Sequence, residues 1–71
     1  MYIVQEIQTN GNSSAVTPAV QKATREEADS VFFFALGAAA VSAVQVHAVV
    51  MLDEKGNLIR SGFYEHPIIT E

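Results

Sequence analysis

The sequence predicts a single small α+β domain, residues 1–71, in which an antiparallel sheet packs on one helix. Three observations predict this class. Both ends of the chain carry segments typical of strands, a capped apolar segment between them has helical spacing, and a glycine turn joins the last two strand-like segments. The expected order is β-β-α-β-β, or β-α-β-β if the residues around Pro18 do not form a strand.

The first third of the chain predicts a hairpin. Residues 2–9 are rich in β-branched and aromatic residues that partly alternate with polar ones, which indicates a strand. Residues 10–14 read Asn-Gly-Asn-Ser-Ser, a composition typical of a turn. Residues 15–23 then predict a second strand. Because Pro18 has no N–H to donate, this strand has to lie at an edge of the sheet or bulge there.

The middle of the chain predicts a helix. Thr24 and Glu27 have the spacing of a capping box, in which each side chain satisfies a free group of the first turn. An apolar stripe at helical spacing follows and extends the helix to about Ala43. The stripe consists of Ala28, Phe32, Ala35, Leu36 and Ala39. At ~100° per residue, three consecutive phenylalanines cover about 200° of a helix, so one core-facing stripe cannot hold all three.

The last third predicts a second hairpin, with strands at residues 44–52 and 58–66 and a turn at 53–57. We expect Gly56 to adopt the left-handed conformation in this turn, and Pro67 to end the last strand. If Asp53 pairs with Asn57, the chain's two histidines lie on opposite faces of the sheet. A register shifted by one residue instead puts them diagonally on one face.

Residues 31–52 form an uncharged run of 22 residues, which is long enough to span a bilayer. Gln45 and His47 interrupt it, acidic residues flank it, and its composition changes from alanine-rich to valine-rich halfway along. The sequence therefore favours a helix followed by a strand over a membrane span. The N-terminus has no basic region of the kind that opens a secretory signal.

The charge balance limits the class of partner. Eight acidic residues oppose four scattered basic ones, for a net charge of −4, whereas nucleic-acid binders carry a basic patch. We therefore expect no nucleic-acid partner. A chain of 71 residues has a small core, and without cysteine it has neither disulfides nor thiolate metal sites to support it. Self-association is the remaining way for so small a chain to stabilise its fold.

Both faces of the strand at 44–52 are apolar, although one helix covers only one face of a small sheet. One face carries Val44, Val46, Ala48, Val50 and Leu52, and the other carries Gln45, His47, Val49 and Met51. Because large exposed apolar patches mark interfaces, the sequence predicts a homo-oligomer. The predicted interface residues are Phe32, Phe33, Phe34, Val49 and Met51.

No motif of an enzyme stands out. The serines at 13, 14, 30, 42 and 61 lie in no recognisable nucleophile motif, and the two histidines have no third ligand at a spacing typical of a metal site. We therefore expect no catalytic activity, no metal and no cofactor. His47, Tyr64 and His66 are the candidate residues for contacting a small ligand such as a nucleotide, through aromatic stacking.

Three short segments resemble a group of small uncharacterised proteins encoded by phages and prophages of gut Gram-positive bacteria. They are Glu-Ile-Gln-Thr-Asn at 6–10, Gly-Ala-Ala-Ala-Val-Ser at 37–42 followed by His47, and Tyr-Glu-His at 64–66. The phenylalanines at 32–34 depart from the group's pattern. The resemblance implies an accessory protein in the bacterial cytoplasm. We expect a non-enzymatic homo-oligomeric module that binds a host or virion protein, for example to block host defence. The alternative is a protein that sequesters a nucleotide-like ligand at a subunit interface.

Overall fold

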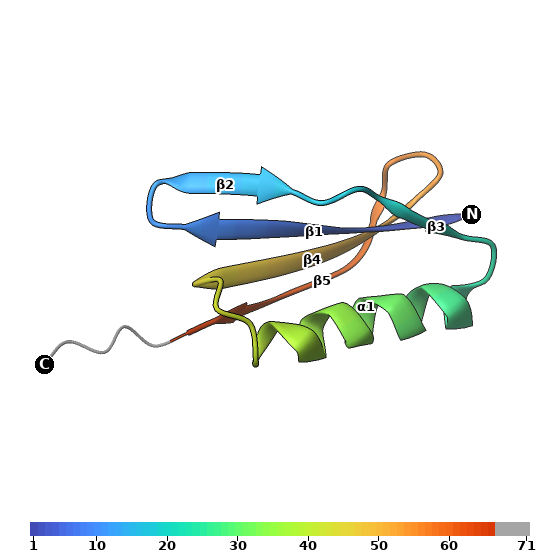
Figure 1. The fold of residues 1–71 in the computed structure, drawn as a ribbon. Coiled ribbons are helices and arrows are strands. Elements are labelled where there is room, and N and C mark those ends of the chain that lie inside the picture. The colour runs from blue at the N-terminus through green and yellow to red at the C-terminus, as the bar shows by residue number, and fades with distance from the viewer. Residues whose placement is uncertain (67–71) are drawn as a thin grey trace, which may run out of the picture.

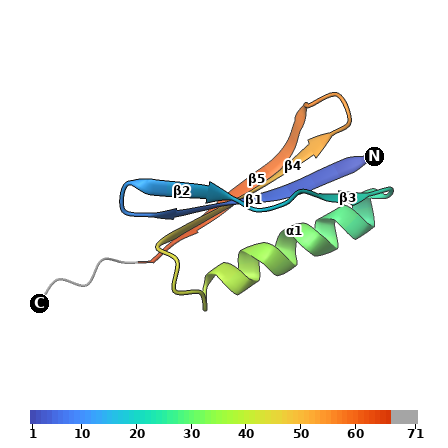
Figure 2. The ribbon, with the colours of Figure 1, turned by 45° about the horizontal axis from the view of Figure 1, so that its top comes forward.

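The computed structural model describes residues 1–66 and contains five strands and one helix in the order β-β-β-α-β-β. The elements are β1 (Tyr2–Asn10), β2 (Ser13–Val16), β3 (Val20–Lys22), α1 (Arg25–Ala39), β4 (Val46–Asp53) and β5 (Leu58–Glu65). The predicted α+β class is confirmed, with α1 packed along one face of an antiparallel sheet (Figures 1 and 2). The expected strand end at Pro67 lies outside the described residues.

The strands lie in the order β2-β1-β4-β5, and β3 also pairs with β1 (Figure 1). β2 pairs with the second half of β1 and β3 with its first residues, so the two short strands share one edge of the sheet. Residues 17–19, which include Pro18, separate them. The strand predicted at 15–23 is therefore an edge strand broken at the proline, because Pro18 cannot donate to the ladder.

The start of α1 follows the first half of the capping-box prediction, the bond from the Glu27 N–H to Thr24, whereas the Glu27 carboxylate bonds to the Thr24 hydroxyl and not to a free backbone group. Thr24 Oγ1 accepts the Glu27 N–H at 3.3 Å and donates to the Glu27 carboxylate at 3.0 Å. The end of α1 does not follow the prediction, because the helix stops at Ala39 and not near Ala43. The next three N–H groups bond to carbonyls three residues back, which tightens the last turn. His66 Nε2 also donates to the Ala39 carbonyl at 2.9 Å and ties this end to β5.

The hairpin of β4 and β5 begins in the predicted register and then shifts. Gly56 has a φ of 85°, as expected, and Leu52 lies opposite Leu58. A bulge between Met51 and Leu52 then moves the pairing by one residue, so His47 lies opposite Tyr64. The shifted register is therefore the one that forms, and both histidines belong to the helix-covered face.

The core lies between α1 and the face of the sheet that carries His47, Val49 and Met51. Its buried apolar residues are Val4, Ala28, Phe32, Val49 and Met51. This corrects the predicted interface, because Phe32, Val49 and Met51 are only 2%, 0% and 0% exposed and lie inside the protomer. Phe33 and Phe34 are 54% and 80% exposed and remain available on the surface.

Gly62 explains why the helix covers this face. It lies opposite Val49, and a Cβ atom placed on it would lie 3.2 Å from Leu36 Cδ2, so a larger residue there would require Leu36 to move. The other face of β5 carries Phe63, which is 69% exposed. A helix on that face would have to pack over a large aromatic ring.

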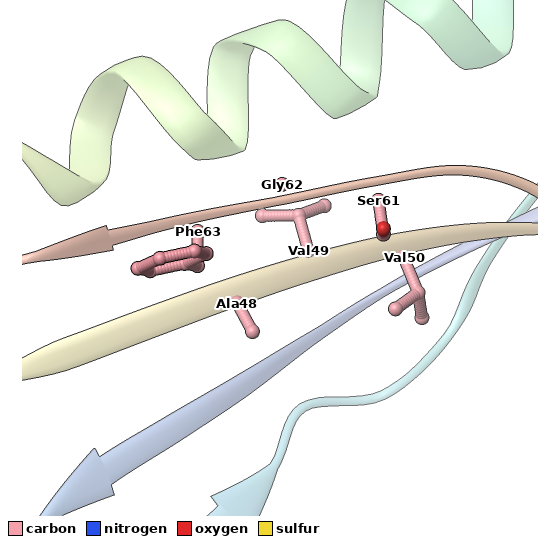
Figure 3. A pocket seen from close by; sticks show the side chains of 6 residues that line it. All are labelled: Ala48, Val49, Val50, Ser61, Gly62 and Phe63. Atoms are coloured by element: carbon pink, nitrogen blue, oxygen red, sulfur yellow. The ribbon is translucent and has the colours of Figure 1, made fainter.

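The uncovered side of the sheet is here called the open face. Figure 3 shows Val49 on the helix side of β4 and Ala48 and Val50 on the opposite side. Strand alternation extends this assignment across the sheet. The apolar residues of the open face are Ile3, Ile7, Val16, Val46, Ala48, Val50, Leu52, Leu58 and Phe63.

Within residues 1–66, no helix is both long and apolar enough to cross a membrane.

Candidate functional site

A polar cluster lies where the C-terminal end of α1 meets the sheet. We call it the histidine cluster, and its members are Glu6, Ser42, His47, Tyr64 and His66. Glu6 comes from β1, His47 from β4 and Tyr64 from β5, His66 follows β5 directly, and the loop after α1 supplies Ser42. The register shift in the last hairpin gathers them, because it places His47, Tyr64 and His66 on one face.

His47 is the centre of the cluster and is 5% exposed. Its Nδ1 lies 3.1 Å from Glu6 Oε2, and its Nε2 lies 2.9 Å from Ser42 Oγ. An ionised carboxylate only accepts hydrogen bonds, so Nδ1 carries the ring proton and donates it to Glu6. In the neutral ring Nε2 then accepts the hydroxyl proton of Ser42. Both ring nitrogens of this buried side chain are therefore satisfied within the protomer.

His66 and Tyr64 complete the cluster. His66 Nε2 lies 2.9 Å from the Ala39 carbonyl oxygen, which accepts its proton. The rings of Tyr64 and His66 pack edge to face with their centroids 5.1 Å apart. All three predicted ligand-contacting residues thus lie close to the same helix end. A ligand that used either imidazole would first have to displace Ser42, Glu6 or the Ala39 carbonyl.

Sequence reasoning missed the roles of Glu6 and Ser42. Ser42, His47 and Glu6 are linked in the order of a serine–histidine–acid triad, with both distances in hydrogen-bonding range. Two features oppose nucleophilic chemistry. Ser42 follows the C-terminus of α1, whose partial negative charge disfavours an oxyanion, and its Oγ already accepts the Val44 N–H at 3.1 Å. This arrangement instead fastens the loop between α1 and β4 to the sheet.

The histidine cluster offers little to a metal ion. Among the described residues, no group of three or more His, Cys, Asp and Glu side chains has a geometry that could hold one. Every buried side-chain nitrogen and oxygen atom in this part of the chain has a hydrogen-bond partner. The cluster therefore lacks the unpartnered polar atoms that mark a vacant binding site.

A second feature is an open depression along β4 and β5. It is lined by Ala48, Val49, Val50, Ser61, Gly62 and Phe63 (Figure 3). The serine hydroxyl is the only polar side-chain group in this lining. The depression offers apolar contact area and almost no groups for orienting a polar ligand, which suits a protein surface better than a nucleotide.

No protein-family model, curated protein or solved structure matches the chain.

Proposed function

We propose that this chain is a non-enzymatic, self-associating interaction module whose open face packs against the open face of a second copy. One observation carries the proposal: α1 covers one side of the sheet, while the other side presents apolar residues from all four strands β1, β2, β4 and β5 with no helix over them. Stable domains bury the apolar faces of their sheets against a second layer. A copy of the same sheet supplies that layer here.

The size of the open face is adequate for a dimer. The sheet is four strand positions wide, and β4 at its centre has eight residues. At ~4.8 Å per strand and ~3.3 Å per residue, the footprint is roughly 500 Å² per copy, or about 1,000 Å² for two. This total reaches the lower end of specific interfaces, at about 1,000 Å².

Charge permits this contact although the chain has a net charge of −4. Among the strand residues, Glu65 is the one charged side chain that the register places on the open face, and it lies at the rim. The polar residues of this face are neutral: Gln5, Thr9, Ser14, Gln21 and Ser61. Two copies can therefore meet without burying like charges.

The resemblance to phage and prophage proteins extends the proposal to a biological partner. In that setting the assembled module acts in the bacterial cytoplasm by binding a host or virion protein. Phe34 and Val41, at 80% and 89% exposed, supply apolar contacts outside the open face for such a partner. A nucleotide-sequestering role draws less support, because the imidazoles of the histidine cluster already bond to protein groups.

Light scattering after size-exclusion chromatography tests self-association at micromolar concentration. We expect the wild-type chain to have at least twice the protomer mass. Val50→Lys, which places a charge in the middle of the open face, should lower that mass. Val41→Lys is the matched control, because Val41 lies in the exposed loop after α1 and should leave the mass unchanged. A wild-type monomer, or an unchanged mass for Val50→Lys, contradicts the proposed open-face contact.

A further inference from the structure

The outer edge of β5 exposes backbone groups that can pair with another strand. β5 pairs with β4 on one side, and no strand within residues 1–66 pairs with its other side. The His66 N–H donates to the Gln45 carbonyl at 2.9 Å, which makes these two a hydrogen-bonded pair. Bonded pairs alternate along an antiparallel ladder, so Tyr64 and Gly62 also bond to β4. The N–H and C=O groups of Ser61, Phe63 and Glu65 therefore point outward.

The two edges of the sheet are protected unequally. On the other edge, β2 and β3 have only four and three residues and are separated at Pro18, which is a common protection against strand addition. β5 runs for eight residues without a proline. The one charged residue in the middle of β5 is Arg60. Its guanidinium lies 4.9 Å from the Phe33 ring centroid and 3.9 Å from Asp29, so it packs on α1 and does not block the approach of another strand.

We propose that β5 pairs antiparallel with β5 of a second copy, about a two-fold axis perpendicular to the sheet. This inference rests on the proposed function, because it adds a second surface to the same self-association. The partner strand is β5 of a second copy, because a two-fold axis perpendicular to the sheet pairs two identical strands antiparallel. Any register that keeps the helix-covered faces of both copies on the same side satisfies this symmetry. A register centred on Gly62 pairs Ser61 with Phe63 of the second copy and runs from Arg60 to Tyr64, beyond the bulge.

The side chains on the helix side of β5 are compatible with pairing between two β5 strands. On the helix side, the register centred on Gly62 brings Arg60 opposite Tyr64 of the second copy, a cation beside an aromatic ring. Phe33, 54% exposed, lies on the flank of α1 nearest β5, as its contact with Arg60 shows. Edge pairing places the Phe33 flanks of the two helices on the same side of the joined sheet, where they can cover the space between the helices.

The edge contact and the open-face contact are compatible. The edge axis is perpendicular to the sheet, whereas the axis that relates two stacked open faces lies parallel to it. Perpendicular two-fold axes that meet generate a closed tetramer with three two-fold axes. The chain therefore assembles as a dimer of dimers, with one contact through β5 and the other through the open face.

Ser61→Pro tests the edge. The Ser61 N–H points outward, so proline removes a donor to the second copy without removing a bond to β4. Light scattering should give a tetramer for the wild-type chain, a dimer for Ser61→Pro, a dimer for Val50→Lys and a monomer for the double variant. Ser61→Ala, which keeps the N–H, should remain a tetramer.

The outcomes separate the two contacts. If Ser61→Pro keeps the wild-type mass while Val50→Lys lowers it, the edge contact is overturned and the open-face contact stands. The reverse pattern supports the edge and overturns the open face. Amide hydrogen exchange on the wild-type chain gives a readout that does not depend on any variant folding. Slow exchange at Ser61 and Phe63 supports pairing, and exchange as fast as that of Glu54 in the exposed turn overturns it.

Discussion

The Nε2 atom of His47 lies 2.9 Å from Oγ of Ser42, so a buried strand residue holds the loop that follows the helix. The same imidazole reaches Glu6 on the neighbouring strand through Nδ1, at 3.1 Å. One side chain thus links β1, β4 and the end of α1. His66 adds a second tie to this helix end through the Ala39 carbonyl. The last turn of α1 has no basic residue of its own, and the His66 imidazole donates to its final carbonyl, while His47 holds the loop that follows.

Ser42→Ala should lower the free energy of unfolding by about 1 to 3 kcal/mol, because it leaves Nε2 of the buried His47 without a partner. Urea denaturation followed by circular dichroism, at one fixed protein concentration, measures the change. Ser30→Ala is the matched control, since Ser30 is exposed on the helix, where alanine is a better helix former. Equal stability of the two variants would show that the Ser42 contact contributes nothing.

Ser42 should not react as a catalytic nucleophile, despite its hydrogen bond to His47. The carbonyl end of α1 precedes it, and that end disfavours the negative charge of an acyl-transfer intermediate. We expect no adduct after incubation with a fluorophosphonate, as measured by intact-protein mass spectrometry. An adduct that forms on the wild-type chain and disappears in Ser42→Ala would contradict the non-enzymatic proposal.

The sequence predicts most of the elements because their signals are local. Thr24 and Glu27 mark the helix start within four residues, and Gly56 marks the turn of the last hairpin. The helix end is different, since Ala39 and the residues after it carry no local stop signal. That end is bonded to His66, which is 27 positions away in the chain.

The histidine cluster depends on one non-local detail. Near the turn, Leu52 pairs with Leu58 as expected, and only the bulge beside Met51 brings His47 opposite Tyr64. No turn residue signals this bulge, so the sequence leaves both registers open. The covered face of β4 is equally ambiguous, because valines occupy both sides of the strand. Gly62 favours the covered face through a close approach to Leu36 that only the three-dimensional structure shows.

Asp53 should titrate below the ordinary range of an aspartate. The side-chain amide of Asn57 donates to its carboxylate at 3.0 Å, and the backbone N–H groups of Asn57 and Lys55 donate as well, which lowers the pKa of Asp53. Because the folded pKa is lowered, this stabilisation is complete above the unfolded value, about 3.9, and is lost as the pH falls through the folded pKa.

Carbon-detected NMR of the Asp53 carboxyl across acidic pH measures this pKa directly. Asn57→Ala removes the largest cause and should raise the pKa of Asp53 toward its ordinary value. The wild-type hairpin should then resist acid better than the variant hairpin. An identical Asp53 titration in both chains would contradict the assignment of Asn57 as the main cause.

Gly62→Ala should destabilise the protein, although alanine usually fits a strand better than glycine. The new Cβ would lie 3.2 Å from Leu36 Cδ2 and 3.4 Å from Cζ of the buried Phe32, so α1 or these side chains must shift. Such overpacking costs about 1 to 3 kcal/mol. Gly37→Ala is the matched control, because a Cβ there meets nothing within 4 Å, and alanine stabilises a helix interior by about 0.5 to 1 kcal/mol.

A double-mutant cycle of Gly62→Ala and Leu36→Ala separates the effect of the contact with Leu36 from a general effect of the Gly62 substitution on β5. If the close approach is the cause, Gly62→Ala should cost less in a Leu36→Ala background, because the shortened side chain leaves room for the new methyl group. Urea denaturation of the four chains measures this coupling. Equal costs in both backgrounds would mean that Leu36 does not set the requirement for glycine. The choice of covered face would then have to arise from Val49 and Met51 alone.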